Sequence, residues 1–119
     1  MAADSTDLSV QVDHLGPHPL VRLSGDVDAE SAPALTETLR AVLTTIGTKP
    51  LVLDLTEVEF MDSSGLGVLI GAHQQAAVQG GALILANPHP RVAKVLRITK
   101  LHKVFTVTET VEEALASEA

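Results

Sequence analysis

Residues Phe60 to Gly71 read FMDSSGLGVLIG, and this stretch decides how the chain is organised. An aspartate and two serines precede an apolar run that glycines interrupt. Such side chains accept hydrogen bonds from the free N–H groups of a first helical turn, so Asp62 or Ser63 is expected to cap a helix. The glycines are expected to let this helix lie close against a sheet. The helix is predicted over residues 65–81, with Leu66, Leu69, Ile70, Ala76 and Ala77 pointing inward.

The sequence on both sides of this helix alternates between strand-like and helix-like patterns. Strands are predicted at residues 8–12, 20–25, 51–55, 82–86 and 103–107, and further helices at 28–47, 90–99 and 110–119. A turn at residues 16–19 is expected to join the first two strands. The order ββαβαβαβα predicts an α/β fold. We expect a mixed β-sheet with an antiparallel hairpin at one edge, later strands mostly parallel, packed with four α-helices.

The ends of the predicted elements carry recognisable signals. Asp28 or Ser31 can cap the helix at residues 28–47, and Thr110 with Glu113 forms a capping box before the last helix. Residues 1–7 are predicted to be a flexible tail. Residues 8–119 are expected to form a single domain.

Composition and charge exclude several classes of function. The chain has 119 residues, a net charge of −7, no cysteine and 2% aromatic residues. An acidic surface disfavours nucleic acid and anionic membranes as partners. Neither a disulfide framework nor thiol chemistry is available without cysteine. The amino terminus lacks the charged and apolar regions of a signal peptide, so a cytoplasmic location is expected.

The motifs of common enzymes do not fit this chain. Met61 and Asp62 stand where a G-x-S-x-G nucleophile elbow requires glycine, and no lysine follows the glycines as in a phosphate-binding loop. Gly65, Gly67 and Gly71 are spaced one residue too widely for a dinucleotide loop. No arrangement of the five histidines has the spacing of a metal site. We therefore expect no catalytic residue, no bound metal and no cofactor.

The segment LVLDLTEVEFMDSSGLGVLIGAHQQAAVQGGALILANPHPRVAKVLRITKLHKVF, together with VRLSGDVDAESAPAL before it, resembles the STAS domain of bacterial anti-sigma factor antagonists. The resemblance extends from about Leu8 to Leu115. It implies a STAS-type fold and a protein that binds an anti-sigma factor, itself a serine kinase, and so releases a sigma factor for transcription. In the family the first serine after the aspartate is phosphorylated, which corresponds to Ser63, and the phosphorylated form lets the kinase go.

The resemblance also assigns expected partners and contact residues. A metal-dependent serine phosphatase would restore the unmodified protein. The residues expected to meet the partner are Gly25, Asp26, Asp28, Met61, Asp62, Ser64, Gly65 and Leu66. Asp28 is expected to lie near the Ser63 loop, either as a helix cap or as a partner contact. Lys100 departs from the family, which usually has a glycine there in a left-handed backbone conformation.

Physical chemistry supports such a switch without fixing every detail. A phosphate at the start of a helix adds about −1.5 to −2 charges where the helix tolerates them, whereas a partner fitted to a neutral hydroxyl would have to desolvate them. Chemistry alone does not distinguish Ser63 from Ser64. Two alternatives stay open: a STAS module of another assembly, such as a lipid-transport complex or a stress-signalling scaffold, and a small-ligand or nucleotide-binding protein.

Overall fold

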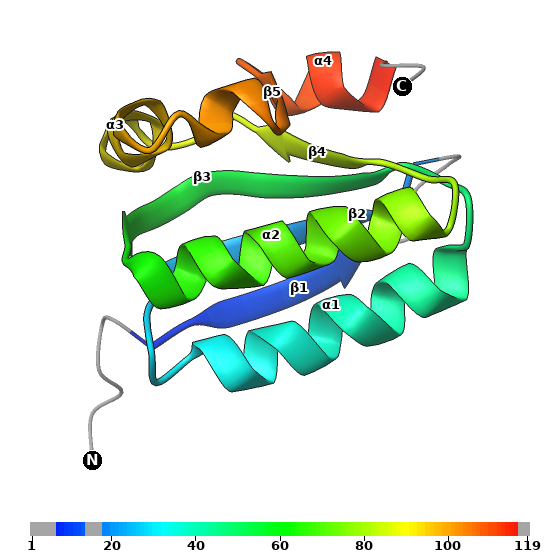
Figure 1. The fold of residues 1–119 in the computed structure, drawn as a ribbon, viewed down its shortest axis with the longest axis horizontal. Coiled ribbons are helices and arrows are strands. Elements are labelled where there is room, and N and C mark those ends of the chain that lie inside the picture. Colours follow the sequence, from blue (N-terminus) through cyan, green and yellow to red (C-terminus); the bar gives the residue numbers. More distant parts are fainter. Residues whose placement is uncertain (1–6, 14–17, 117–119) are drawn as a thin grey trace.

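The computed structural model describes residues 7–13 and 18–116. Within them, the five strands are β1 (Ser9–Asp13), β2 (Leu20–Val27), β3 (Leu51–Met61), β4 (Leu83–Ala86) and β5 (Thr106–Thr108). The helices are α1 (Ala32–Ile46), α2 (Ser63–Val78), α3 (Pro90–Ile98) and α4 (Val111–Ala116), and a short 3₁₀ helix covers Leu101–Lys103. The sheet order is β1-β2-β3-β4-β5. Strand β1 is antiparallel to β2 and all other neighbours are parallel, which confirms the predicted mixed sheet (Figure 1).

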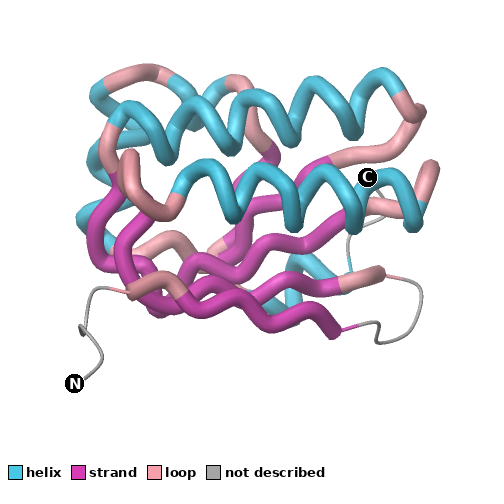
Figure 2. Tube along the Cα trace, turned by 90° about the horizontal axis from the view of Figure 1, so that it is seen from below, coloured by secondary structure: helices cyan, strands magenta, loops and turns pink. Residues whose placement is uncertain are grey.

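The helices cover the two faces of the sheet unequally. Helices α1 and α2 lie side by side across one face, as Figures 1 and 2 show. The main apolar core joins this face to α1, α2 and α3, through residues such as Leu39, Leu69 and Leu96. A smaller cluster on the other face joins Val52 and Ile84 to Ala114 of α4. The first five residues of β3 are all buried, as expected for a strand that is covered on both sides.

Helix α1 begins at Ala32, later than the predicted range of 28–47, and its buried face is the one that the apolar spacing predicts. Its buried side chains are Leu35, Leu39, Val42, Leu43 and Ile46. The helix ends at Gly47, whose φ of 64° lies in the region that favours glycine and whose N–H donates to the Leu43 carbonyl at 3.1 Å. The capping box before α4 also forms, since Thr110 Oγ1 accepts from the Glu113 N–H at 3.0 Å. In return, the Glu113 carboxylate accepts from the Thr110 N–H at 3.2 Å.

Two strands differ most from the prediction. Strand β3 continues beyond residue 55 to Met61, because its second half pairs with β2 alone after the pairing with β4 has ended at Asp54. Strand β5 begins only at Thr106, because residues expected at its start belong to the 3₁₀ helix and the turn after it. Lys100 precedes that 3₁₀ helix with φ 63° and ψ 15°, so it does adopt the left-handed conformation.

The amino-terminal hairpin forms with the expected antiparallel pairing, from Ser9 opposite Ser24 to Asp13 opposite Leu20. Val12, predicted on the buried face of β1, is 37% exposed because it lies near the end of an edge strand. Half of the predicted turn at residues 16–19 and most of the predicted tail at residues 1–7 lie outside the described residues. None of the described helices is long and apolar enough to cross a membrane.

Candidate modification and partner-binding site

The candidate site lies where β3 ends and α2 begins. Asp62 occupies the N-cap position in an extended conformation, and its Oδ1 accepts from the N–H groups of Ser64 at 2.8 Å and Gly65 at 3.2 Å. Of the two predicted caps, the structure therefore selects Asp62. Ser63 is the first residue of the helix and is exposed, and none of the hydrogen bonds found among the described residues uses its hydroxyl. Ser64 is half-buried.

Gly65 sets how closely the first turn of α2 approaches the sheet. A Cβ at this position would stand 2.6 Å from Met61 Cγ, 2.8 Å from the Val27 carbonyl oxygen and 2.9 Å from Val27 Cγ1. Both Gly65 and Met61 are buried, and Met61 is only 4% exposed. Met61 and Gly65 thus form the tight support beneath the helix start, and their contact with a partner stays a prediction.

The other glycines of α2 have a different surrounding from the one predicted. Gly67 and Gly71 have no atom within 4 Å of an added Cβ, so they do not bring the helix close to the sheet. Both are exposed on the side of α2 that faces α1. Ala77, predicted to point inward, is also exposed, whereas Leu66 is half-buried and packs against the edge of the core.

The loop from β2 to α1 lies beside this site. The Val27 carbonyl accepts from the Asp62 N–H at 3.2 Å, which places Asp28 next to the loop that carries Ser63. The Asp28 carboxylate accepts from the N–H groups of Glu30 at 3.1 Å and Ser31 at 3.0 Å. Ser31 Oγ in turn accepts from the Asp28 N–H at 3.0 Å. Asp28 thus orders the turn that leads into α1. This is one clear structural role of the residue.

Two further expected contact residues precede this loop. Gly25 has φ 116°, and a Cβ there would collide with the backbone of Asp7. Glycine is therefore required at this position, because the two chain segments approach each other closely. Asp26 is half-buried and lies opposite Phe60 in the register of β2 with β3. Phe60 is 49% exposed, and sequence reasoning missed it as a surface residue of the site. Because the strand was predicted to end at residue 55, the prediction did not include the pairing of Phe60 with β2.

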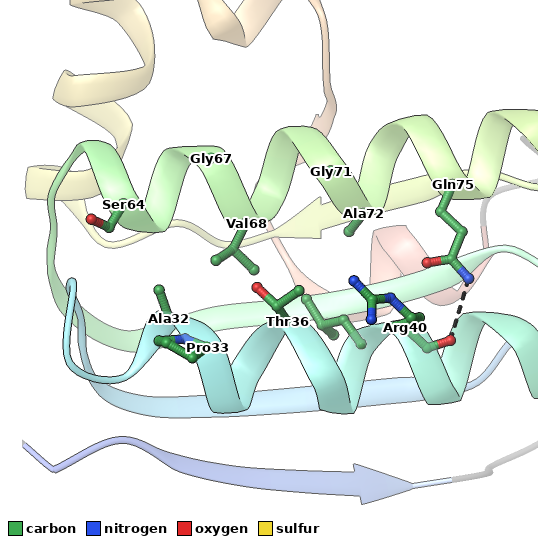
Figure 3. Close-up of a pocket in the computed structure, with 11 residues that line it drawn as sticks. Ala32, Pro33, Thr36, Arg40, Ser64, Gly67, Val68, Gly71, Ala72 and Gln75 are labelled. Carbon is green, nitrogen blue, oxygen red and sulfur yellow. Dashed lines mark hydrogen bonds between the residues drawn. The ribbon is translucent and has the colours of Figure 1, made fainter.

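A groove separates α1 from α2 and starts at the site (Figure 3). It has a volume of about 380 Å³ and runs from Ser64 at one end to Arg40 and Gln75 at the other. Its floor and walls include Pro33, Val68 and the exposed glycines of α2. Sequence reasoning did not find this groove, because it depends on how two separate helices pack.

Among residues 7–13 and 18–116, no cluster of three or more potential metal ligands occurs.

The chain forms a mixed sheet with an antiparallel edge, covered mainly on one face, and an exposed serine stands at the start of α2. These features are those of a small α/β domain of the STAS type. The chain belongs to the STAS domain family, which matches residues 9–114. It is 36% identical over 88 residues to the anti-sigma-B factor antagonist of Bacillus subtilis, covering 74% of this chain and 79% of that protein. Its relatives by sequence thus include anti-sigma factor antagonists.

Solved structures give the same result. An anti-sigma factor antagonist from Mycobacterium paratuberculosis superimposes with a TM-score of 0.84 at 27% identity, and the match covers 96% of each chain. The anti-sigma factor antagonist SpoIIAA in its unphosphorylated form superimposes with a TM-score of 0.77 at 25% identity, covering 90% of this chain and 93% of that one. The family resemblance and the fold inferred from the sequence are both confirmed.

Proposed function

We propose that this protein is an anti-sigma factor antagonist whose binding to an anti-sigma factor kinase is ended by phosphorylation of Ser63. The observation that carries the proposal is the exposed Ser63 hydroxyl, unengaged in any described hydrogen bond, at the first position of α2. The names of the relatives support the antagonist role, and one structural neighbour is described by its phosphorylation state. The chain then acts as a binding partner and as a kinase substrate, with no catalytic group of its own.

The surroundings of the two serines favour Ser63 over Ser64. A kinase must bring the γ-phosphate of ATP in line with the hydroxyl, which requires a side chain that is accessible and free to turn. Ser63 is exposed, whereas Ser64 is half-buried and lines the groove beside α1. Phosphate on Ser64 would have to fit between the two helices. Ser63 is therefore the proposed acceptor.

The position of Asp62 determines how the phosphate acts. Its carboxylate already accepts from the N–H groups of Ser64 and Gly65, so a phosphate on Ser63 would not need to capture them. It would remain at the surface and add its charge beside Asp62 and close to Asp28. A partner surface fitted to the neutral serine would have to desolvate this charge, and a loss of about 3 kcal/mol would weaken binding about a hundredfold.

The test compares wild type, Ser63→Ala and Ser63→Asp as baits in a native lysate, followed by phosphorylation with the captured kinase and ATP. We expect wild type and Ser63→Ala to retain the kinase and Ser63→Asp to lose it. Mass spectrometry should place phosphate on Ser63 of the wild type and on no residue of Ser63→Ala. Ser64→Ala is the matched control for the acceptor and should still be phosphorylated on Ser63. Equal capture by all three baits, or phosphate on Ser64 alone, would refute the switch.

The proposal also implies a reverse step and a location. A metal-dependent serine phosphatase would remove the phosphate and return the protein to its binding-competent form. Both enzymes act on the same surface around α2, in the cytoplasm, where ATP and sigma factors are found. Capture of a membrane ATPase complex by the wild-type bait, with no kinase present, would instead favour a STAS module of a transport assembly.

A further inference from the structure

The length and the open glycine positions of the groove between α1 and α2 fit another helix. From Ser64 to Gln75 it follows roughly 16 Å of α2, which is about three helical turns. Gly67 and Gly71 have open space beyond the position of an added Cβ. Residues without side chains at such points allow the backbone of another helix to approach closely, because the interaxial distance depends on the side chains at the contact.

The helices that form the walls are held in place at one end. Gln79 Nε2 donates to the carbonyls of Leu43 at 2.7 Å and Gly47 at 3.1 Å, both at the carboxyl end of α1. Gln75 Nε2 donates to the Arg40 carbonyl at 3.3 Å and to Gln79 Oε1 at 3.0 Å. The spacing of the helices is therefore fixed by bonds at the end remote from Ser63. Among the described residues, no hydrogen bond joins the two helices at the end near Ser63.

The charge of the groove indicates the chemistry of its occupant. Arg40 is the one charged residue among the described residues that line it, in a chain with a net charge of −7. Figure 3 shows its side chain extending from α1 toward α2. Its ion pair with Glu37 at 3.4 Å joins two side chains that are 60% and 73% exposed, so the guanidinium is available for exchange with another carboxylate.

We infer that this groove binds an amphipathic helix of the anti-sigma factor, with its apolar face on the glycines of α2 and a carboxylate on Arg40. The inference rests on the proposed function, because it names where the same partner docks. The groove begins at Ser64, next to the phosphorylated residue, so the seated helix would end against Ser63. Phosphate there then meets the end of that helix.

The test fills the groove without disturbing the fold. Gly71→Leu places a side chain in open space at a helical position where glycine is itself unfavourable, so the free protein keeps its stability. We expect at least a tenfold loss of affinity for the purified anti-sigma factor that phosphorylates the wild-type chain. Ala77→Leu is the control, because Ala77 is an exposed residue of the same helix that does not line the groove.

Two further variants identify the seated helix. Arg40→Glu should weaken binding, and a lysine in place of the partner's carboxylate should restore it. Because the chain has no cysteine, Gly71→Cys creates a single thiol for a photo-crosslinker, and Ala77→Cys gives the control. We expect Gly71→Cys to crosslink to one helix of the anti-sigma factor that contains an acidic residue.

The outcomes separate this inference from the proposed function. If the wild type binds the anti-sigma factor and is phosphorylated on Ser63, but Gly71→Leu binds with unchanged affinity, the groove assignment is wrong and the switch stands. Crosslinks to a loop or strand of the partner would likewise refute it. If the wild type binds no anti-sigma factor, the proposed function and the docking site fall together.

Discussion

At the scale of single residues, Gly65 and Gly67 are close in sequence but have opposite constraints. A methyl group on Gly65 would meet Met61 Cγ at 2.6 Å, whereas one on Gly67 would meet no atom within 4 Å. Gly65→Ala is therefore expected to lower the free energy of unfolding by about 1–3 kcal/mol through overpacking. Gly67→Ala should leave it unchanged or raise it by up to about 1 kcal/mol, because alanine is the better helix former.

Urea unfolding followed by far-UV circular dichroism would measure both variants, since the chain has no Trp or Tyr to report by fluorescence. Equal destabilisation by the two substitutions would show that the first turn of α2 is not pressed against the strand ends as described.

Asp62 carries the second prediction at this scale. Asp62→Ala removes the acceptor of two N–H groups at the start of α2 and should cost about 1 kcal/mol of unfolding free energy. Asp62→Asn keeps an acceptor oxygen and should stay close to wild type in thermal and urea unfolding. Ser63→Ala should change stability by less than about 0.5 kcal/mol, because the Ser63 hydroxyl takes part in none of the described bonds. A larger loss of unfolding free energy in Ser63→Ala than in Asp62→Ala would show that Ser63, and not Asp62, caps the helix.

At the scale of elements, the junction after α3 holds a strained residue. Lys100 has φ 63°, a conformation that costs an L-residue about 1–2 kcal/mol relative to glycine. Lys100→Gly should raise the unfolding free energy by about 0.5–1 kcal/mol after the added entropy of the unfolded chain is subtracted. Lys94→Gly, on the exposed side of α3, is the control and should lower it by about 1 kcal/mol. If both substitutions destabilise, the left-handed turn does not exist in solution.

The elements also show which parts of the fold the sequence made predictable. Helix α1 and the first half of β3 have uninterrupted apolar patterns, so hydrophobic periodicity locates them correctly. The second half of β3 contains Glu57, Glu59 and exposed Phe60, because only β2 pairs with it and one side of the strand is open there. A strand without a continuous buried face has no strong periodicity, and its end was therefore placed too early.

At the scale of the whole molecule, the candidate site combines local signals with packing that a sequence does not contain. The Asp-Ser-Ser-Gly motif predicted the helix start, and its resemblance to a family predicted the role of Ser63. Whether a glycine faces the sheet or the solvent could not be predicted, because glycine has no side chain to show periodicity. Likewise, the groove depends on the packing of α1 against α2, and these two helices are separated in the sequence by the whole of β3.

The last prediction concerns how the molecule as a whole responds to a charge at Ser63. Because Asp62 holds the cap and Ser63 is exposed, Ser63→Asp should leave the free energy of unfolding within about 0.5 kcal/mol of wild type. The favourable interaction of an anion with a helix amino terminus, about 0.3–1 kcal/mol, offsets its repulsion by Asp62. Urea unfolding and amide NMR spectra would measure this, with spectral changes confined to the start of α2 and the adjoining β2–α1 loop. Changes that spread over the sheet, or a stability loss above about 1.5 kcal/mol, would mean that the switch acts by refolding the domain rather than by placing charge on its binding surface.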